Sequence, residues 1–182
     1  MKITLVRHGE TDYNRDGKMQ GRTNNYLNDE GRRQCKKLRT KLDDKHFDVC
    51  YMSPLLRTVE TAIILIGDRV MTVTDPRIIE RDLGDFENKD YSLFDHKKYW
   101  DYKLNINENG VEPIQDVFSR CKDFLNYIIK KHPNQDILIV SHASPIRAMH
   151  HLLKGNNLEK DIYFKIPNCY VEEIEYDGKI IK

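Results

Sequence analysis

Two short apolar runs rich in β-branched residues constrain the fold more than any other feature of the chain. The first occupies residues 3–6 and the second residues 137–140, and each is followed within two positions by a histidine, His8 or His142. Runs of this kind are typical of parallel strands that are buried on both faces. Because ligands bind at the carboxyl ends of the strands in an open α/β sheet, both histidines are expected where such a fold holds its ligand.

Strand-like and helix-like segments alternate along the chain, which predicts an α/β fold of three layers, a mainly parallel sheet with helices on both faces. Strands are expected at residues 3–7, 48–52, 70–74 and 136–141, helices at residues 29–44, 53–66, 113–131 and 144–154, and a hairpin at residues 170–181. Ser53-Pro54 and Ser144-Pro145 each indicate a helix start, with serine as the N-cap and proline at the first helical position. The hairpin would give the sheet an antiparallel edge.

Residues 85–112 are the exception to this regular pattern. They are rich in Asp, Lys, Asn and Tyr, and their apolar residues show weak periodicity. A long segment of this kind inside a compact domain is often functional, so we expect a small cap insertion over the site, with a helix near residues 90–103. Its aromatic residues, among them Tyr91, Tyr99 and Trp100, either form a wall for a base-like substrate or pack onto the core.

The composition limits the classes of partner. The 30 Lys and Arg residues nearly balance the 29 Asp and Glu residues, for a net charge of +1, so no strong field attracts nucleic acid or an anionic membrane. No apolar run is long enough to span a bilayer, and the run at the start is too short for a secretory signal. The four cysteines show no disulfide or zinc-ligand spacing. With 182 residues, we expect a single domain, residues 1–182, in a reducing cytoplasm.

Arg7 and His8 form the first candidate pair for chemistry. A phosphoryl group carries charge on three oxygens, so it needs fixed positive groups and an in-line nucleophile. The planar fork of arginine binds two oxygens at once, and a neutral imidazole can form a covalent phosphoramidate. The residues alone leave the alternative open that Arg7 is a surface charge and His8 a buried structural histidine.

Arg57 and His142 are two further candidate site residues because of where they lie in the predicted elements. Arg57 lies one turn into the second predicted helix and faces the same way as Thr61, although most helical arginines face solvent. His142 ends a strand and precedes a helix start, where the amides of Ala143 and Ser144 are suited to bind an anion. Taken alone, a histidine that simply ends a strand is the plainer interpretation.

An acidic segment supplies candidates for proton transfer. A carboxylic acid can protonate a leaving alkoxide and then deprotonate water. The residue types do not choose among Glu80, Asp82, Asp85 and Glu87. An ion pair with Arg81 is the usual fate of such a carboxylate and remains the alternative.

Several short motifs follow one another in a fixed order. They are the LVRHGET segment at residues 5–11 with Asn14, the loop Gln20-Gly21-Arg22, the SPLLRT segment at residues 53–58, the segment with Glu80, Gly84 and Glu87, and Val140-Ser141-His142 with Pro145-Ile146-Arg147. With these motifs the chain resembles the histidine phosphatase superfamily, also called the phosphoglycerate mutase-like family. The resemblance extends from Leu5 to about Pro167, and several motifs in order are far more specific than one.

The resemblance implies a role for each of these positions. His8 would be phosphorylated, Arg7, Arg57 and His142 would grip the phosphoryl oxygens, and Glu80 would act first as general acid and then as general base. The residues that would help to hold the phosphate or the substrate are Asn14, Gln20, Gly21 and Ala143. Neither a metal nor another cofactor is implied, because the cationic side chains do what a metal would do.

Four positions depart from the family pattern. Ala143 stands where the family usually has glycine, Asn24 and Tyr26 stand where the first long loop usually carries Asp and Pro, and Asn88 stands where a glycine commonly follows the acidic segment. Asparagine tolerates the left-handed backbone conformation well. None of these changes removes a chemical group that the reaction needs.

The cap segment separates the functional alternatives. No arginine lies between Leu83 and Ser119, only four lysines, and lysine is a weaker bidentate binder of carboxylates. A phosphoenzyme that does not hold its product admits water, so we expect hydrolysis of a small phosphorylated metabolite. The alternative is a cofactor-dependent phosphoglycerate mutase. A phosphate-binding protein without catalysis is a third hypothesis, but no motif residue is missing.

Overall fold

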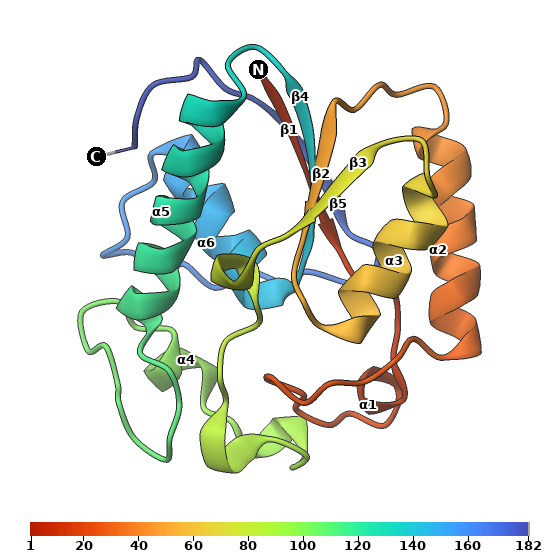
Figure 1. Cartoon of the computed structure of the whole chain (residues 1–182). Helices are drawn as coiled ribbons and strands as arrows, with labels where there is room; N and C mark the ends of the chain where they lie inside the picture. Colours follow the sequence, from red (N-terminus) through yellow and green to blue (C-terminus); the bar gives the residue numbers. More distant parts are fainter. Residues whose placement is uncertain (182) are drawn as a thin grey trace.

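The computed structural model describes residues 1–181 and contains a five-stranded sheet in the order β3-β2-β4-β1-β5 (Figure 1). The strands are β1 Lys2–Arg7, β2 Val49–Met52, β3 Met71–Thr74, β4 Asp136–Ser141 and β5 Val171–Glu175. The first four run parallel, and β5 pairs with β1 in the antiparallel direction at the edge. The predicted α/β fold with a mainly parallel sheet is confirmed.

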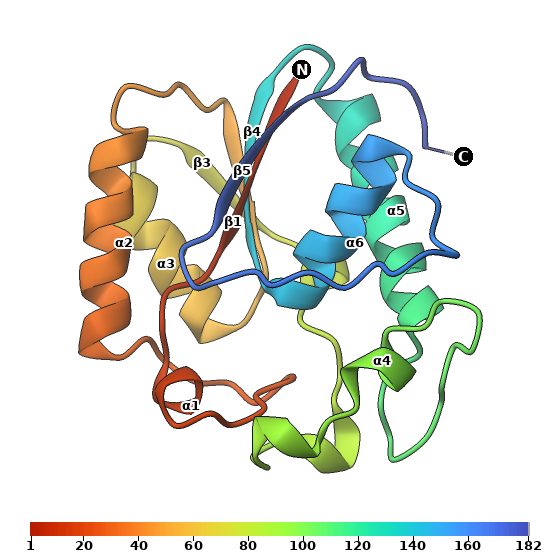
Figure 2. The ribbon, with the colours of Figure 1, turned by 180° about the vertical axis from the view of Figure 1, so that it is seen from behind.

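Helices cover both faces of the sheet and complete the three layers. The α-helices are α1 Asp12–Arg15, α2 Asp29–Leu42, α3 Leu56–Ile66, α4 His96–Tyr99, α5 Ile114–Lys131 and α6 Ala143–Lys154, and the 3₁₀ turns are η1 Pro76–Ile78, η2 Gly84–Phe86 and η3 Tyr91–Leu93. Helices α2 and α3 lie on one face, and α5 and α6 lie on the other (Figures 1 and 2). In the described residues, 1–181, no helix has the length and apolar character needed to cross a bilayer.

Strands β1 and β4 are buried on both faces, as their apolar runs predicted, whereas the edge strand β3 is largely exposed. In β1, Ile3 and Leu5 pack into the cluster that includes α5 and α6, whereas Val6 packs into the cluster that includes α2 and α3. Successive side chains of a strand point to opposite faces, so each face receives its own apolar layer. The sheet is therefore held firmly between two helical layers, which fixes the ends of its strands.

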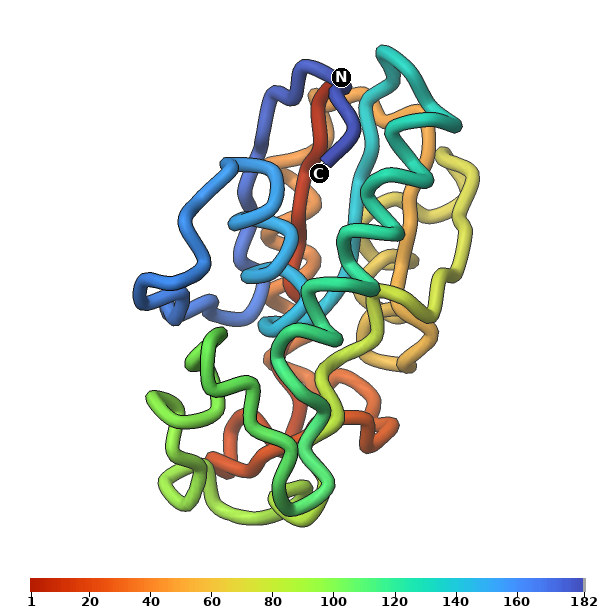
Figure 3. The backbone as a smooth tube through the Cα atoms, turned by 90° about the vertical axis from the view of Figure 1, so that its left-hand side faces the viewer, coloured from red at the N-terminus to blue at the C-terminus, as the bar shows by residue number. Residues whose placement is uncertain are grey.

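The cap segment, residues 85–112, lies beyond the carboxyl ends of the parallel strands, beside the loop that follows β1 (Figure 3). An isolated bridge between Lys18 and Asp90 joins the two segments. Tyr99 and Trp100 are 2% and 5% exposed, so these aromatic residues pack onto the core. Tyr91, at 45%, remains exposed.

The cap does not form the helix predicted near residues 90–103. It forms the turn η3 and the single-turn helix α4 instead. Asp90 accepts from the amide of Ser92, Asp95 from that of Lys98, and Asp101 from those of the residues two and three positions later. Each aspartate starts a new turn with its side chain, and such local bonds compete with a continuous helix. Nearby, Asn88 has φ +64°, the left-handed conformation that asparagine tolerates.

Helix α3 begins three residues later than predicted, because Ser53 is used elsewhere. Its amide donates to the Val140 carbonyl over 3.1 Å, which continues the β2–β4 ladder, and its hydroxyl lies 2.7 Å from Nε2 of His142. The side chain of Asn24, in the preceding loop, accepts from the Leu56 amide over 2.8 Å. A residue from another segment therefore caps the helix.

The predicted C-terminal hairpin is wrong beyond its first strand. β5 forms the predicted antiparallel edge, next to β1, but it ends at Glu175 and no second strand follows it in residues 176–181. The backbone of Ile181 forms two hydrogen bonds, of 2.8 and 3.0 Å, with the side chain of Asn126 on α5. The C-terminal segment is thus bound to α5 by the Asn126 side chain instead of pairing as the second strand of a hairpin.

Candidate active site

The ends of β1 and β4 bring the two predicted histidines together. In the parallel register of these strands Arg7 pairs with Ser141, and the His8 amide donates to the Ser141 carbonyl over 3.1 Å. His8 and His142 therefore meet, with ring centroids 5.2 Å apart and ring planes at 60°. Both side chains are buried.

The surroundings of His8 keep its imidazole neutral and set its tautomer. Nδ1 lies 2.7 Å from the Gly9 carbonyl oxygen, which can only accept, so the ring donates from Nδ1 and carries its lone pair on Nε2. Burial lowers the pKa of His8 well below its usual value, and the charges of Arg57 and Arg7 lower that pKa further. At neutral pH the ring has the free lone pair that a nucleophile requires.

His142 lies behind His8, and protein groups engage both of its ring nitrogens. The Arg57 Nε–H donates to Nδ1 over 3.2 Å. The neutral ring therefore carries its proton on Nε2, which donates to Ser53 Oγ over 2.7 Å. Burial, and then the charge of Arg57, lowers the pKa of His142 well below its usual value. The His142 ring packs against His8 and accepts a hydrogen bond from Arg57, so it helps to hold both side chains in place.

Arg57 is fully buried at the start of α3, with its guanidinium fixed from several sides. Besides its bond to the histidine ring, Nη1 donates to the Thr23 carbonyl over 2.7 Å and Nη2 to the Gly21 carbonyl over 2.8 Å. Burial lowers the pKa of Arg57 to about 10. Thr61, predicted on the same helix face, donates to the Arg57 carbonyl and accepts from the Gly9 amide over 3.1 Å. One helix face thus links the arginine to the histidine loop.

Arg7, the last residue of β1, is a half-buried cation, and one of its donors is buried and unsatisfied. Its Nη1 donates to the Ile166 carbonyl, but its buried Nε has no hydrogen-bond partner among the described residues. Burial lowers the pKa of Arg7 to about 10, although the charge of Glu80 opposes this effect. A buried donor without a partner is costly, so this one indicates a site that an anion completes.

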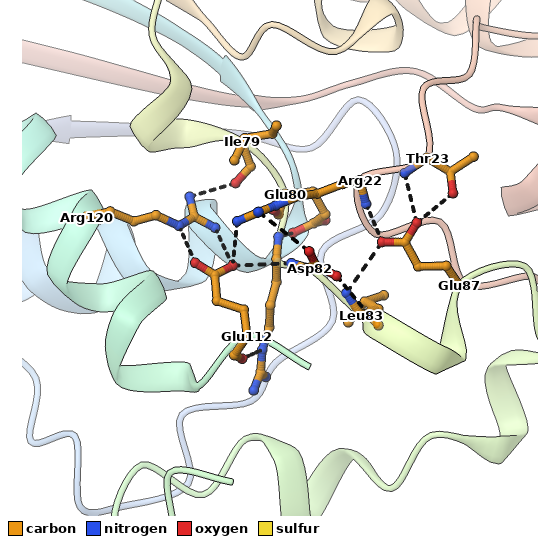
Figure 4. Close-up of polar contacts among 11 residues, drawn as sticks. Arg22, Thr23, Ile79, Glu80, Asp82, Leu83, Glu87, Glu112 and Arg120 are labelled. Carbon is orange, nitrogen blue, oxygen red and sulfur yellow. Dashed lines mark hydrogen bonds and ion pairs between the residues drawn. The ribbon is translucent and has the colours of Figure 1, made fainter. Parts of the chain in front are cut away.

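The loop that holds Arg57 is itself held by a carboxylate. Glu87 turns toward this loop (Figure 4) and accepts from the amides of Arg22 and Thr23, over 2.7 and 3.0 Å. Gly21 has φ +50°, and a Cβ built there would lie 2.0 Å from Glu87 Oε1. Only glycine therefore fits beside the carboxylate, and its carbonyl is free to face Arg57.

A cavity of about 620 Å³ lies at the carboxyl ends of β1 and β4, against the cap. Eight of the nine residues predicted for the site line it: Arg7, His8, Asn14, Gln20, Gly21, Arg57, Glu80 and Ala143. The ninth, His142, does not line the cavity, but it contacts His8 and Arg57, which do. The side-chain oxygens of Asn14 and Gln20 both accept from Thr11, which fixes these two amides at the cavity wall.

Glu80 is the one carboxylate among the described residues that line the cavity, which distinguishes it from the other three acidic candidates. Its Oε1 accepts from the amides of Arg81 and Ser144, over 2.9 and 3.1 Å. Ser144, predicted as an N-cap, is the second residue of α6, and its amide is engaged by this carboxylate. Arg120 donates to the Ile79 carbonyl over 2.7 Å and so holds the preceding residue (Figure 4).

The cavity is strongly cationic. The Lys and Arg side chains that line it are Arg7, Lys18, Arg57, Arg81, Arg147 and Lys165. Arg147 and Lys165 were not predicted as site residues. Arg147 lies four positions after Ala143 on α6, so helical spacing was the signal available for it, whereas nothing in the sequence pointed to Lys165. Among residues 1–181, no three His, Cys, Asp or Glu side chains gather as a set of metal ligands.

Arg147 and His96 form a second polar region of the cavity, set among aromatic rings. The guanidinium carbon of Arg147 lies 4.7 Å from the ring centroid of Trp100 and 4.5 Å from that of Tyr163. Its Nε donates to the Phe164 carbonyl, and burial lowers its pKa. Both ring nitrogens of His96 are buried without a hydrogen-bond partner in the described part of the chain. These donors suit a second polar group of a ligand.

Known proteins are similar in sequence to this chain over almost its whole length. The family described as the histidine phosphatase superfamily (branch 1) matches residues 3–181. The chain is 35% identical to phosphoserine phosphatase 1 of Hydrogenobacter thermophilus, over 98% of this chain and 88% of that protein. It is 31% identical to the adenosylcobalamin/alpha-ribazole phosphatase of Escherichia coli, over 98% of this chain and 92% of that protein.

A solved structure shares the fold. A phosphoserine phosphatase mutant from Entamoeba histolytica, in complex with phosphoserine, has a TM-score of 0.83 and 25% identity, covering 97% of this chain and 92% of that chain. The motifs, the cavity at the strand ends and the family match over residues 3–181 thus agree. The chain belongs to the histidine phosphatase superfamily.

Proposed function

We propose that this protein hydrolyses small phosphate monoesters through a covalent phosphohistidine on His8. The observation that carries the proposal is the pairing of a neutral imidazole with two guanidiniums, the half-buried Arg7 and the buried Arg57, in one cavity. The guanidinium N–H groups can donate to the three negatively charged phosphoryl oxygens, and the lone pair on Nε2 can attack the phosphorus. Phosphatase activity is also what the names of the two similar proteins given above state, those from Hydrogenobacter thermophilus and Escherichia coli.

The first step transfers the phosphoryl group to the enzyme. Nε2 of His8 attacks phosphorus in line with the leaving oxygen, so that a P–N bond forms as the P–O bond breaks. Arg7 and Arg57 hold the oxygens while their charge is redistributed. The hydrogen bond from Nδ1 to the Gly9 carbonyl stabilises the positive charge that the ring acquires. His142 keeps Arg57 in place through its Nδ1.

Glu80 moves the proton in both steps. In its acidic form it donates to the leaving alkoxide, and as a carboxylate it then accepts a proton from the water that attacks phosphohistidine. The P–N bond breaks, inorganic phosphate leaves, and the His8 lone pair is restored. The two amides that bond Glu80 hold it at the cavity wall in both forms.

Hydrolysis is favoured over the mutase reaction, although the absence of arginine in the cap is a weaker reason than it seemed. Arg147 from α6 and Lys165 from the later loop line the cavity, so cations are available to hold a product. The similar proteins described above are phosphatases. We therefore retain water as the acceptor of the phosphoryl group.

The preferred substrate, in this proposal, carries a second anionic group such as a carboxylate. Arg147 holds its guanidinium against two adjacent aromatic rings, which leaves its edge for a ligand, and His96 adds one ring N–H donor near it. A small phosphorylated acid would place its phosphate at His8 and its carboxylate at this pair. The phosphoserine bound to a similar protein is a molecule of this kind.

The decisive experiment is to trap the intermediate. We expect ³²P from a labelled monoester to appear on wild-type protein as an acid-labile phosphohistidine, and His8→Ala to carry no label and to release no phosphate above background. His46→Ala is the matched control, because that ring is 76% exposed at the surface. Equal, slow phosphate release by wild type and His8→Ala would favour a phosphate-binding protein without catalysis.

A second assay separates hydrolysis from transfer. The protein is supplied with 3-phosphoglycerate and a priming amount of the bisphosphate, and isomer and inorganic phosphate are measured together. We expect phosphate release to exceed isomer formation. Isomerisation that outpaces phosphate release would establish the mutase instead.

A further inference from the structure

Two cysteines that are far apart in the sequence lie side by side under the nucleophile. Cys35 on α2 and Cys169 just before β5 are 134 positions apart, yet their Sγ atoms are 3.6 Å from each other. Both are free thiols. Their spacing in the sequence gave no sign of this pairing. A disulfide bond is about 2 Å long, so the two sulfurs need to approach by about 1.5 Å to be joined.

The pair encloses the backbone that carries His8. The Cys169 amide donates to the His8 carbonyl over 3.2 Å, and the neighbouring Asn168 side chain donates to the carbonyls of His8 and Gly9. On the other side, a Cβ built on Gly9 would lie 2.7 Å from the Cys35 sulfur. A change in the distance between the two sulfurs therefore shifts groups that contact the backbone of His8 and Gly9.

The remaining cysteines have different surroundings. Cys50 and Cys121 are buried, their sulfurs contact backbone carbonyls, and burial raises the pKa of each thiol to about 12. The hydrogen bond between the two thiols lowers the pKa of Cys35 and raises that of Cys169, so Cys35 is the one that ionises more easily. Cys35 is buried and Cys169 is partly exposed, so a small oxidant would approach the pair from the Cys169 side. Of the four cysteines, these two are arranged for oxidation.

We propose that Cys35 and Cys169 form a reversible disulfide in the presence of hydrogen peroxide, and that this modification inactivates the phosphatase. One thiolate attacks a peroxide oxygen, the O–O bond breaks, and a sulfenic acid and hydroxide form, the hydroxide taking up the proton that the thiol lost. The second thiol attacks the sulfenic sulfur and water leaves. Two thiols and one peroxide thus give one disulfide and two water molecules. Intracellular disulfides of this transient kind are commonly redox-sensing.

Formation of the disulfide is expected to disturb the site by displacing the backbone of His8. Cys169 has φ +54°, a conformation that is uncommon for residues other than glycine, and its amide bond to His8 depends on that geometry. When Cys169 moves toward α2, the His8 backbone moves or loses this bond. A displacement of about 1 Å at a reacting group can cost up to about 100-fold in rate. We expect the oxidised protein to lose at least about tenfold in kcat/KM.

The test treats the full-length protein with hydrogen peroxide and follows two readouts. Peptide mapping by mass spectrometry without reduction measures the Cys35–Cys169 cross-link, and hydrolysis of an aryl phosphate measures activity. We expect both to change together and dithiothreitol to reverse both. Cys169→Ser is expected to keep its activity in peroxide, while the matched control Cys50→Ala, which leaves the pair intact, is inactivated like wild type.

The two readouts keep this proposal separate from the proposed function. The cross-link is measured by mass alone, whatever reaction the site performs. The proposal is overturned if no Cys35–Cys169 peptide forms, if the cross-linked protein keeps its activity, or if Cys169→Ser loses activity as fast as wild type. In that last case the oxidant acts at another group.

Discussion

The two halves of the cavity are built in different ways. On one side, Arg7 ends β1, His8 follows it directly, and Arg57 lies in the first turn of α3; His8 and Arg57 are buried, Arg7 is half-buried, and each side chain forms a hydrogen bond with the backbone. On the other side, the cap consists of short turns, and Tyr91 at its edge is 45% exposed. The first half is shaped before any ligand binds. The second half consists of short turns and single-turn helices, which Tyr99 and Trp100 anchor to the core.

From this difference we infer that the two halves have different tasks, with phosphoryl transfer in the first and substrate selection in the second. Transfer of a phosphoryl group depends on the placement of charges to a fraction of an ångström, and only rigid elements provide it. Choice among substrates depends on which groups surround the rest of the molecule. We therefore expect changes at the strand ends to affect every substrate alike, and changes in the cap to affect some substrates and spare others.

Arg57→Ala provides the strongest test of the rigid half. The variant removes a charge that binds the transferred group and the donor that orients His142, so kcat/KM should fall about 10³-fold for all monoesters. Arg57→Lys should recover part of the loss, because lysine restores charge without the planar fork. Steady-state kinetics on an aryl phosphate and a carboxylated monoester measures both effects.

The exposed Arg15, which pairs with Asp12 on the surface, serves as the matched control. Arg15→Ala should leave kcat/KM within twofold of wild type, since surface ion pairs contribute little. A loss in Arg57→Ala that differs strongly between the two substrates would contradict the assignment of this arginine to the phosphoryl group.

Glu80→Gln tests the proton-transfer role in the same half. Glutamine keeps the shape and accepts from the same amides, but it cannot donate a proton as an acid. We expect phosphorylation by an alkyl phosphate to slow about 100-fold, and phosphorylation by an aryl phosphate with a good leaving group to change much less. Single-turnover kinetics isolates this step.

Asp82→Asn is the control for Glu80, because Asp82 belongs to the same acidic segment but does not line the cavity. It should show no dependence on the leaving group. Equal losses for both esters in Glu80→Gln would argue against an acid and for a purely structural carboxylate.

The rigid half was largely predictable from the sequence. Apolar runs located β1 and β4 and placed His8 and His142 at the edge of the sheet where ligands bind, and the pairing of these two strands then brings the rings together. The spacing of Arg57 and Thr61 predicted that they share one helix face, but it did not predict that this face is buried against the histidine loop. The choice of Glu80, by contrast, came from the family resemblance, and its place at the cavity agrees with that choice.

Long-range contacts were what the sequence did not reveal. No local pattern indicated that Asn24 caps α3 from another loop or that Asn126 draws the C-terminal segment out of the sheet. Arg147 comes to the cavity from α6 and meets Trp100 of the cap, and the pairing is visible only once the chain is folded. The cap itself was misjudged because aspartate side chains, rather than apolar spacing, decide where its turns begin.

His96→Phe tests the cap half, with the smallest expected effect. Phenylalanine keeps a ring of similar size among Tyr91, Phe94 and Tyr163, but it removes the two ring nitrogens that have no protein partner in the described chain. A hydrogen bond to a substrate contributes about 1 kcal/mol, so kcat/KM for a carboxylated monoester should fall about fivefold. Activity on an aryl phosphate without a carboxylate should stay as in wild type. If both substrates lose equally, the cap shapes the catalytic half after all; if neither changes, the ring of His96 packs against its neighbours and does not contact the substrate.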